Sequence, residues 1–425
     1  MWAPCGVYLK ILLPTLGSAG DVNPVIGLGL ALQSRGHRAT VITNPYFAEL
    51  IERQGLEFLP VGTLEDAQRA FSYPHLWHPR KGAEHIMRFM IDPIRQIYHL
   101  IESHADSDTV VAASGISLGA RVAQERLGIP TASVHLQPSL IRSYIDQGKV
   151  VNLRIAAWQP MWFKRAFYWL ADRMLLDRIV GPPLNEFRAT LGLRPVNRLF
   201  DEWIQSTQCV IGLFPDWFAA RQPDWPAHAH LVGFPLWDDG DGEQPLTNEA
   251  QEFLAAGEAP IVFTPGSAGA TMQRFFRESV RAAAQLGVRA MLVTNHPQQL
   301  PPRLPASVRA FGYLPFSALL PRVAFLVHHG GVGTMAQCIK AGVPQLVVPS
   351  AFDQFDNAWR VQLLGLGGNL PQTRYRSGRV TSMLRMMLDD RSLSQRCQDH
   401  AGRIDGEASL RRACELIEAL HRSAP

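Results

Sequence analysis

The amino-acid sequence predicts an α/β protein built from two Rossmann-like, doubly wound domains that face each other across a cleft. Short β-rich runs alternate with helical patterns, which favours mostly parallel sheets joined by right-handed crossovers. This alternation stops near the middle of the chain and then starts afresh. Open α/β sheets bind ligands at the carboxyl ends of their strands, so two such sheets predict a cleft with one ligand on each side.

The first half of the chain holds the first series of strands and helices. The run VYLKILLP predicts a buried strand, and VIGLGLALQSRG predicts a helix that ends on Gly36. Strands are predicted at 7–14, 38–43, 56–61, 109–114 and 131–136, with helices over 25–36 and 116–127. Each strand run is rich in apolar or β-branched residues, as buried strands are.

The pattern changes after residue 150. Residues 150–205 are helical in pattern and rich in tryptophan and arginine. Further strands are predicted at 209–213, 230–234, 260–265, 289–294, 308–314, 324–329 and 344–349, and an amphipathic helix at 408–422. We therefore predict an N-terminal domain over 1–235, a linker over 236–258, a C-terminal domain over 259–405, and a terminal helix within 406–425 that packs back toward the N-terminal domain.

Composition narrows the class of protein. The chain has 425 residues, of which 47% are hydrophobic and 18% charged, and its net charge is +4. This mild charge gives no basic stripe for nucleic acid. Five scattered cysteines fit a reducing compartment better than a disulfide framework or a zinc site. The apolar N-terminus lacks a basic region, which favours mature protein over a signal peptide. We expect a cytoplasmic protein, with the inner membrane face as a candidate contact.

The turn HHGGVGT, over residues 328–334, follows an apolar run. Its glycines allow the backbone to approach a ligand closely. A helix predicted over 334–341 would offer unpaired N–H groups and the positive end of its dipole to a phosphate or diphosphate. His329 can donate a hydrogen bond to the same anion, whereas His328 is ambiguous and can simply finish the strand. A merely structural turn is the alternative.

Two longer stretches carry a family resemblance. The run from His328 to Gly367 and the run PTLGSAGDVNPVIGLGLALQSRGHRATVIT, over 14–43, resemble family 1 nucleotide-sugar glycosyltransferases of the GT-B fold, at the sterol and antibiotic end of that family. The resemblance implies an acceptor-binding N-terminal domain and a donor-binding C-terminal domain. It also implies inverting transfer without a metal ion or cofactor. The acidic run at 238–243 is then a solvated part of the linker.

The resemblance implies a set of donor contacts. They come from Ser267, Tyr313, His329, Gly331, Gly333, Thr334, Asp353 and Gln354. Asp353 and Gln354 would hydrogen-bond sugar hydroxyls, because Asp356 is better placed to cap the next helix. The Tyr313 ring could stack on the nucleobase of the donor. Phe316 stands where plant members have a glutamine, which leaves the identity of the nucleobase open. The alternative for Ser267 is a plain turn serine.

Asp21 is the implied general base. The acceptor hydroxyl must lose its proton as it attacks the anomeric carbon, and a positioned carboxylate can take it. Helix capping is the alternative, yet Pro24 suits the first helical position, which would make Asn23 the N-cap and leave Asp21 outside the helix. Phosphate binding by the backbone of this turn is a third possibility. Gly20 and His135 are candidates for acceptor binding, with a buried structural role as the alternative for His135.

The acceptor side is expected over 66–100 and 140–205. The stretch AAWQPMWFKRAFYWLADRMLLDRIV admits three interpretations: a helix face packed on the sheet, an apolar acceptor pocket, or a surface helix with Lys164, Arg165 and Arg173 toward anionic lipid. The segment 212–238 resembles rhamnosyltransferases that act on a fatty-acid-derived acceptor. That favours dTDP-L-rhamnose as donor and a hydroxyacyl lipid as acceptor. UDP-glucose with a sterol, polyphenol or other small aglycone is the alternative, ahead of a UDP-sugar epimerase or a non-catalytic binding protein.

Overall fold

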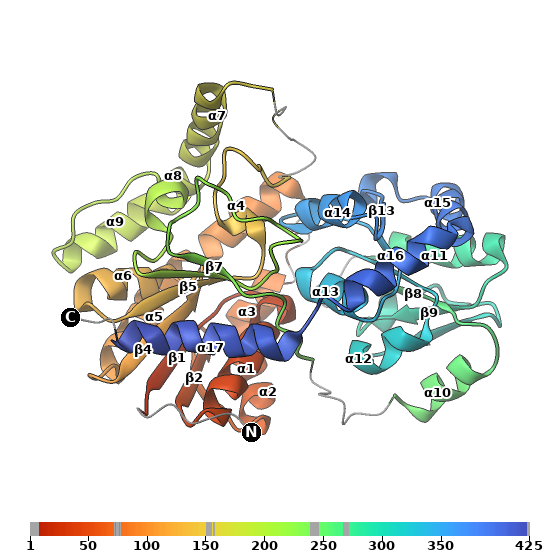
Figure 1. Ribbon diagram of the computed structural model, residues 1–425, viewed down its shortest axis with the longest axis horizontal. Helices are drawn as coiled ribbons and strands as arrows, with labels where there is room; N and C mark the ends of the chain where they lie inside the picture. Colours follow the sequence, from red (N-terminus) through yellow and green to blue (C-terminus); the bar gives the residue numbers. More distant parts are fainter. Residues whose placement is uncertain are drawn as a thin grey trace. The chain divides into compact units, whose positions relative to one another are not determined.

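The computed structural model describes residues 8–71, 73, 76, 78–149, 155, 158–238, 246–266 and 272–422. The chain divides into two compact units, which are described separately (Figure 1). Unit 1 comprises Met1–Gly148, Leu153–Pro235 and Gly406–Pro425. Unit 2 comprises Lys149–Asn152 and Leu236–Asp405. No helix among these described residues is both long enough and apolar enough to cross a membrane.

Unit 1 contains a seven-stranded parallel sheet in the order β3-β2-β1-β4-β5-β6-β7. Its strands are β1 (Lys10–Pro14), β2 (Arg38–Thr43), β3 (Glu57–Pro60), β4 (Thr109–Ser114), β5 (Thr131–His135), β6 (Cys209–Gly212) and β7 (Ala229–Leu231). Leu12 pairs with Thr40 on one side and with Val111 on the other. The chain leaves β1 toward β2 and returns to β4, so the strand order reverses between β1 and β4.

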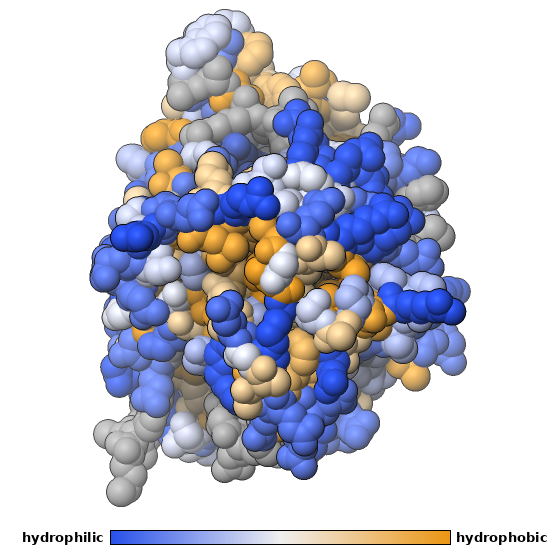
Figure 2. Space-filling model, turned by 90° about the vertical axis from the view of Figure 1, so that its right-hand side faces the viewer, coloured by the Kyte–Doolittle hydropathy of each residue, from blue (hydrophilic) through white to orange (hydrophobic). Residues whose placement is uncertain are grey.

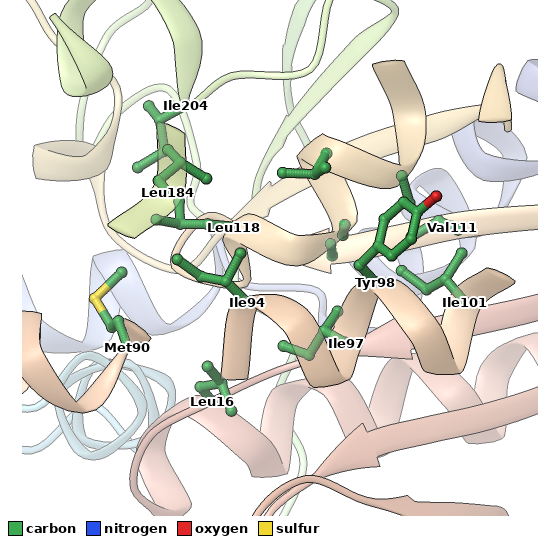
Figure 3. Packing of buried hydrophobic residues seen from close by; sticks show 14 of the residues in the cluster. Leu16, Met90, Ile94, Ile97, Tyr98, Ile101, Val111, Leu118, Leu184 and Ile204 are labelled. Atoms are coloured by element: carbon green, nitrogen blue, oxygen red, sulfur yellow. The ribbon is translucent and has the colours of Figure 1, made fainter. Parts of the chain in front are cut away.

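Unit 1 also contains a series of helices. They are α1 (Ala19–Ser34), α2 (Ala48–Arg53), α3 (Leu64–Phe71), α4 (Pro79–Phe89), α5 (Ile91–His104), α6 (Leu118–Leu127), α7 (Met161–Met174), α8 (Leu176–Ile179), α9 (Gly181–Thr190) and α17 (Gly406–Arg422). On α5, Ile94, Ile97 and Ile101 recur at helical spacing and pack with Leu118 and Val111 in the core (Figure 3). This apolar stripe fixes α5 on the sheet.

The last helix, α17, belongs to unit 1 and runs beside α1 (Figure 1). Its Glu418 side chain is almost fully buried. It accepts hydrogen bonds from Arg35 Nη2 at 2.9 Å and from His37 Nε2 at 3.0 Å. Burial alone would raise the pKa of Glu418, but the bonds from Arg35 and His37 lower it below its ordinary value. The terminal helix is therefore held by a buried ion pair as well as by apolar contacts.

Unit 2 contains a six-stranded parallel sheet in the order β10-β9-β8-β11-β12-β13. The strands are β8 (Ile261–Thr264), β9 (Ala290–Val293), β10 (Val308–Phe311), β11 (Phe325–His328), β12 (Gln345–Val347) and β13 (Gly367–Asn369). The helices are α10 (Asn248–Ala255), α11 (Gln273–Leu286), α12 (Phe316–Leu319), α13 (Val332–Lys340), α14 (Gln354–Leu363), α15 (Ser377–Asp389) and α16 (Arg391–Ala401). The strand order reverses between β8 and β11.

Short helical turns complete the two units. The 3₁₀ turns are Pro45–Phe47, Pro138–Leu140, Pro297–Gln299, Leu320–Arg322 and Gln372–Arg374, and Leu199–Trp203 is a π-helix.

Part of the predicted linker is folded. Residues 248–255 form α10, and Ala250, Phe253 and Leu254 belong to the core of unit 2. The hydroxyl of Thr247 accepts a hydrogen bond from the Ala250 N–H and caps this helix. The acidic run is also partly ordered, because the buried Asp238 accepts the Ser317 N–H at 3.0 Å in the first turn of α12. Asp238 is thus not a solvated charge, and residues 239–243 lie outside the described residues.

Candidate functional site

The strand reversal of unit 2 places His329 at a position where open α/β sheets bind ligands. Gly266 follows β8, and His329 follows the neighbouring strand β11. The His329 ring lies against two glycines. A Cβ atom at Gly266 would be 2.5 Å from His329 Cε1, and one at Gly331 would be 2.5 Å from His329 Nε2. Both positions must therefore lack a side chain for the imidazole to occupy this place.

His329 is a neutral imidazole at neutral pH. Burial lowers its pKa to about 4. Among the described residues its Nδ1 atom is buried and has no hydrogen-bond partner. A neutral imidazole has one N–H donor and one acceptor nitrogen. The ring therefore retains hydrogen-bonding capacity at the end of β11.

The helix that follows the turn begins earlier than predicted. α13 spans Val332–Lys340 with Gly331 as its N-cap, so Gly333 and Thr334 lie within its first turn. The first of its hydrogen bonds runs from the Met335 N–H to the Gly331 carbonyl oxygen at 3.0 Å, which leaves the preceding N–H groups outside the helical pattern. A Cβ atom at Gly333 would meet nothing within 4 Å. The helix N-terminus thus opens onto space that an anion can enter.

His328 has a structural role. Its side chain is fully buried, and its Nδ1 accepts the Gly330 N–H at 3.2 Å. The proton must then be on Nε2, which donates to Gln345 Oε1 at 2.9 Å. Both ring nitrogens are satisfied, so this histidine ties β11 to β12 and to the glycine turn.

The loop after β12 differs from the sequence interpretation. α14 begins at Gln354 with Asp353 at the N-cap position, so Asp356 is not the N-cap. Asp356 is buried in the first turn, where its Oδ1 accepts the Lys149 N–H and its Oδ2 accepts Arg360 Nε–H. The helix starts early because Gln354 Oε1 accepts the N–H groups of Ser350 and Ala351, at 2.9 and 3.2 Å. The Gln354 oxygen is therefore committed to the loop.

The sequence analysis missed Asn357, which joins two loops of the candidate site. Its buried Nδ2 donates to the Gly330 carbonyl oxygen at 2.9 Å and to Asp353 Oδ2 at 2.8 Å. Gly330 has φ +97°, and a Cβ atom there would lie 2.7 Å from Val347 Cγ1. One amide group thus joins the glycine turn to the Asp353 loop. The spacing of Asp353 and Asn357, four residues apart, becomes a signal only when the start of α14 is known.

The remaining predicted donor residues are less closely grouped. Tyr313 follows β10, an edge strand separated from β8 by β9, and its side chain is 49% exposed. Phe316 begins α12. Ser267 lies outside the described residues.

In unit 1 the corresponding reversal follows β1, and it carries Asp21. α1 begins at Ala19 with Ser18 as its N-cap, so Asp21 lies within the first turn and the expectation that Asn23 is the N-cap is wrong. Asp21 Oδ2 accepts the Ser18 N–H at 2.8 Å and the Ser18 hydroxyl at 3.1 Å, as the acidic residue of a capping box does. The carboxylate folds back over Gly17, where φ is +128° and a Cβ atom would be 2.3 Å from Oδ2.

Helix capping uses only one oxygen of the Asp21 carboxylate. Within the described part of the chain, the hydrogen bonds to this side chain end on Oδ2, which leaves Oδ1 for a ligand. Burial raises the pKa of Asp21, and the two bonds from Ser18 only partly oppose this effect. A raised pKa makes the carboxylate a stronger base than an ordinary aspartate. The neighbouring Gly20 is exposed at the second position of the helix.

His135 fits the structural alternative. It ends β5 and is fully buried. Its Nε2 bonds Gln205 Oε1, and its ring lies 2.2 Å from where a Cβ atom of Gly115 would be. Burial lowers the pKa of His135 to about 4. A fully buried ring offers no surface to an acceptor.

Across the described ranges, no group of three His, Cys, Asp or Glu residues is arranged to hold a metal ion. The described cysteines, Cys209, Cys338, Cys397 and Cys414, are all buried thiols.

Comparison with known proteins places this geometry in a family. Residues 11–144 match the glycosyltransferase family 28 N-terminal domain, and residues 282–410 match the C-terminal domain described as erythromycin biosynthesis protein CIII-like. The chain is 30% identical over 368 residues to glycosyltransferase GtfE of Amycolatopsis orientalis, covering 84% of this chain and 85% of that protein. It is 27% identical over 422 residues to O-mycaminosyltylonolide 6-deoxyallosyltransferase of Streptomyces fradiae, covering 96% and 97%.

Solved structures agree on the fold. The glycotransferase of kitacinnamycin superposes with a TM-score of 0.75 at 18% identity, covering 99% of this chain and all of that one. The calicheamicin glycosyltransferase CalG4 gives a TM-score of 0.72 at 21% identity, covering 98% and 100%. The predicted pair of parallel-sheet, Rossmann-like domains is therefore confirmed. The chain belongs to the family 1 glycosyltransferases of the GT-B fold, has antibiotic glycosyltransferases among its relatives, and is a sugar-transferring enzyme.

Proposed function

We propose that this enzyme transfers rhamnose, with inversion, from dTDP-L-rhamnose to the hydroxyl group of a hydroxyacyl lipid, with Asp21 as general base. The observation that carries the proposal is the neutral His329 ring beside the N-terminus of α13 at the strand reversal of unit 2. Uncommitted N–H groups and an imidazole at one point suit an anion such as a diphosphate.

The donor diphosphate would sit on the first turn of α13. The N–H groups of Gly333 and Thr334, the Thr334 hydroxyl and one His329 N–H would contact its oxygens. As the bond to the sugar breaks, negative charge grows on the departing diphosphate. Fixed dipoles aimed at that charge stabilise the transition state. We propose that this arrangement acts without a metal ion, because helix dipole and histidine supply the electrostatic stabilisation.

The sugar would lie beside the Asp353 loop. Asp353 can accept a hydrogen bond from a sugar hydroxyl while Asn357 holds its Oδ2 atom. Gln354 would contribute through its NH₂ group, since its oxygen is bound to the loop. Tyr313 is exposed enough to stack on a base. Each of these contacts belongs to the proposal.

Asp21 would take the proton of the acceptor hydroxyl. The carboxylate is fixed by Ser18 through Oδ2, so Oδ1 is the atom that would receive the proton. Its raised pKa brings its proton affinity closer to what general-base catalysis needs near neutral pH.

Relatives support the thymidine donor. dTDP-epi-vancosaminyltransferase of Amycolatopsis orientalis is 28% identical over 370 residues, covering 84% of this chain and 85% of that protein. The spinosyn rhamnosyltransferase SpnG superposes with a TM-score of 0.68 at 19% identity, covering 96% and 100%, and it has also been solved with thymidine diphosphate.

The acceptor class rests on the resemblance of residues 212–238 to rhamnosyltransferases that act on fatty-acid-derived acceptors. UDP-glucose with a small aglycone or sterol is the second candidate. Vancomycin aglycone glucosyltransferase of Amycolatopsis orientalis, 27% identical over 434 residues, favours it. So does sterol 3-beta-glucosyltransferase of Pichia angusta, although this chain covers only 33% of that protein.

The test is a product assay by mass spectrometry. Purified enzyme is given dTDP-L-rhamnose or UDP-glucose together with a hydroxydecanoyl lipid, a sterol or a polyphenol. The proposal predicts a rhamnosylated lipid as the main product. A glucosylated sterol or polyphenol would replace the proposed donor and acceptor with the second candidate. Conversion of a donor sugar without any acceptor would indicate an epimerase and overturn the proposal.

A further inference from the structure

Helix α7 (Met161–Met174) exposes many large apolar side chains. They are Met161, Trp162, Phe163, Phe167, Trp169, Leu170 and Met174. Trp162 is 70% exposed, whereas Lys164 is buried. A surface helix of a globular protein normally turns its apolar stripe inward and its charges outward. This helix instead leaves its large apolar side chains exposed together with Arg165 and Arg173, and it stands away from the sheet of unit 1 (Figure 1).

The inward face of α7 is held by polar and aromatic contacts. Arg142 Nη2 donates to both carboxylate oxygens of Asp172, at 2.8 and 3.0 Å. The Arg142 guanidinium carbon lies 4.3 Å from the centre of the Tyr168 ring. The Arg165 guanidinium lies 5.5 Å from the centre of the Tyr144 ring. These contacts anchor α7 to unit 1 and leave the large apolar side chains named above on the surface.

An apolar patch of this kind indicates an interaction, since soluble proteins rarely expose contiguous apolar side chains. On the one face that Figure 2 shows, hydrophilic residues surround a group of hydrophobic residues near the centre. The patch lies on a convex helix, not in a hollow. The cavity of about 240 Å³ beside Arg142 and Tyr144 is lined by residues from other segments, and small molecules bind in concave sites.

A second copy of the chain is a poor match for this patch. A 14-residue helix is about 21 Å long, and its exposed side is about 10 Å wide. One such face covers about 200 Å², against about 800 Å² per partner in stable protein complexes. A single in-plane helix is enough, however, for binding to a lipid surface.

We propose that α7 docks the enzyme on an anionic membrane surface, with its apolar face in the headgroup region. Charge favours this partner. Within α7 and α8, Lys164, Arg165, Arg173 and Arg178 are basic, and Arg165, Arg173 and Arg178 are exposed. The two acidic residues there are both engaged, Asp172 by Arg142 and Asp177 by the Leu199 N–H. Tryptophan, phenylalanine and arginine together are the side chains that favour an anionic lipid interface.

The proposal rests on α7 alone and does not depend on the donor or acceptor. If the acceptor is a lipid, docking would bring the enzyme to its substrate. If the acceptor is soluble, α7 would still bind vesicles. Failure of vesicle binding and failure of sugar transfer are therefore separate results.

Vesicle co-sedimentation of the full chain tests the docking. We expect binding to vesicles of equal parts phosphatidylcholine and phosphatidylglycerol, weaker binding to phosphatidylcholine alone, and loss of the difference at high salt. The double variant Trp162→Gln/Leu170→Gln should weaken binding to both vesicle types by about tenfold or more, because it removes apolar area from the membrane face. Arg173→Gln should weaken binding about fivefold on the anionic vesicles only.

The matched control changes apolar residues of similar exposure in unit 2. Leu363→Gln/Met386→Gln alters side chains that are 66% and 64% exposed and should bind as the wild type does. Circular dichroism melting checks that each variant is folded. The proposal is overturned if the wild type fails to sediment with anionic vesicles, or if the α7 double variant binds as tightly. It is also overturned if the wild type is a dimer that this variant dissociates while no vesicle binding is seen.

Discussion

The side-chain amide of Asn357 donates a hydrogen bond to the carbonyl oxygen of Gly330 at 2.9 Å. Its second N–H reaches Asp353 Oδ2 at 2.8 Å. Two backbone segments that the chain separates by more than twenty residues are therefore fixed to each other by one buried group. In the proposed function the first segment holds the diphosphate and the second holds the sugar, so Asn357 would set the distance between the two halves of the donor site.

Replacing Asn357 with alanine should weaken donor binding. The change removes two hydrogen bonds, each worth about 1 kcal/mol, and leaves the buried Gly330 carbonyl unpaired. We expect the KM for the donor to rise about tenfold or more, with a smaller change in KM for the acceptor. Steady-state kinetics with each substrate varied in turn measures this. Leu363→Ala, at the exposed far end of the same helix, is the control and should behave as the wild type does. Equal rises in both KM values would point to general unfolding instead of donor positioning.

Asp21→Asn separates the two roles of Asp21. Asparagine keeps an oxygen that can accept the Ser18 N–H, so α1 should stay capped. It cannot act as a base, and kcat should fall by about 10²–10⁴. Calorimetry of thymidine diphosphate should show unchanged affinity. Wild-type turnover by this variant would remove Asp21 from the mechanism.

The pH profile of kcat should carry the signature of Asp21. The carboxylate must be ionised to accept a proton, so activity is lost as pH falls through its pKa. Because burial raises that pKa, the acidic limb should lie above the ordinary aspartate value of about 3.9. Ser18→Ala removes one hydrogen bond that lowers the pKa, so the limb should move to higher pH. If Ser18→Ala left the acidic limb of the profile unchanged, that limb would belong to another titrating group.

Glu418 should stabilise unit 1 through its pair with Arg35 and His37. Its pKa is lowered in the folded protein, so its contribution is present above the unfolded pKa and is lost as pH falls toward the folded value. Glu418→Gln should lower the free energy of unfolding by about 3 kcal/mol at neutral pH, because it leaves Arg35 without its charged partner. Urea denaturation at neutral and acidic pH measures this difference, which should shrink at acidic pH.

Glu415→Gln on the same helix is the control for Glu418→Gln. Glu415 pairs with Arg412 at the surface, and such pairs contribute little. If the two variants lost the same stability, the buried ion pair would not be what holds α17.

The sequence predicted the strands other than β13, because strands buried on both faces appear as continuous apolar runs that need no partner to be recognised. The strand β13 was missed because its sequence, GGN, contains no such run. The sequence also located His329 and Asp21, since strand order places the residues after β1 and β11 at ligand-binding edges. The orientation of individual helices and side chains was harder to predict. The face that α7 turns outward depends on Arg142 and Tyr144, and the role of Asn357 depends on Gly330, both distant in sequence. The sequence analysis missed that Ser18 is the N-cap of α1 and Asp353 the N-cap of α14. In each case a side chain of the first turn, Asp21 or Gln354, accepts hydrogen bonds from the preceding loop. α10 was missed because its short apolar pattern sits inside a polar segment.

The assignment of the turn after β11 to the diphosphate is tested most directly by calorimetric binding of thymidine diphosphate to the wild type and to His329→Ala. We expect the wild type to bind and the variant to bind about tenfold or more weakly, because the ring would donate a hydrogen bond to the diphosphate in a partly buried site. His421→Ala, on α17, should bind as the wild type does. Equal affinity in the wild type and His329→Ala would contradict the assignment of this turn to the diphosphate.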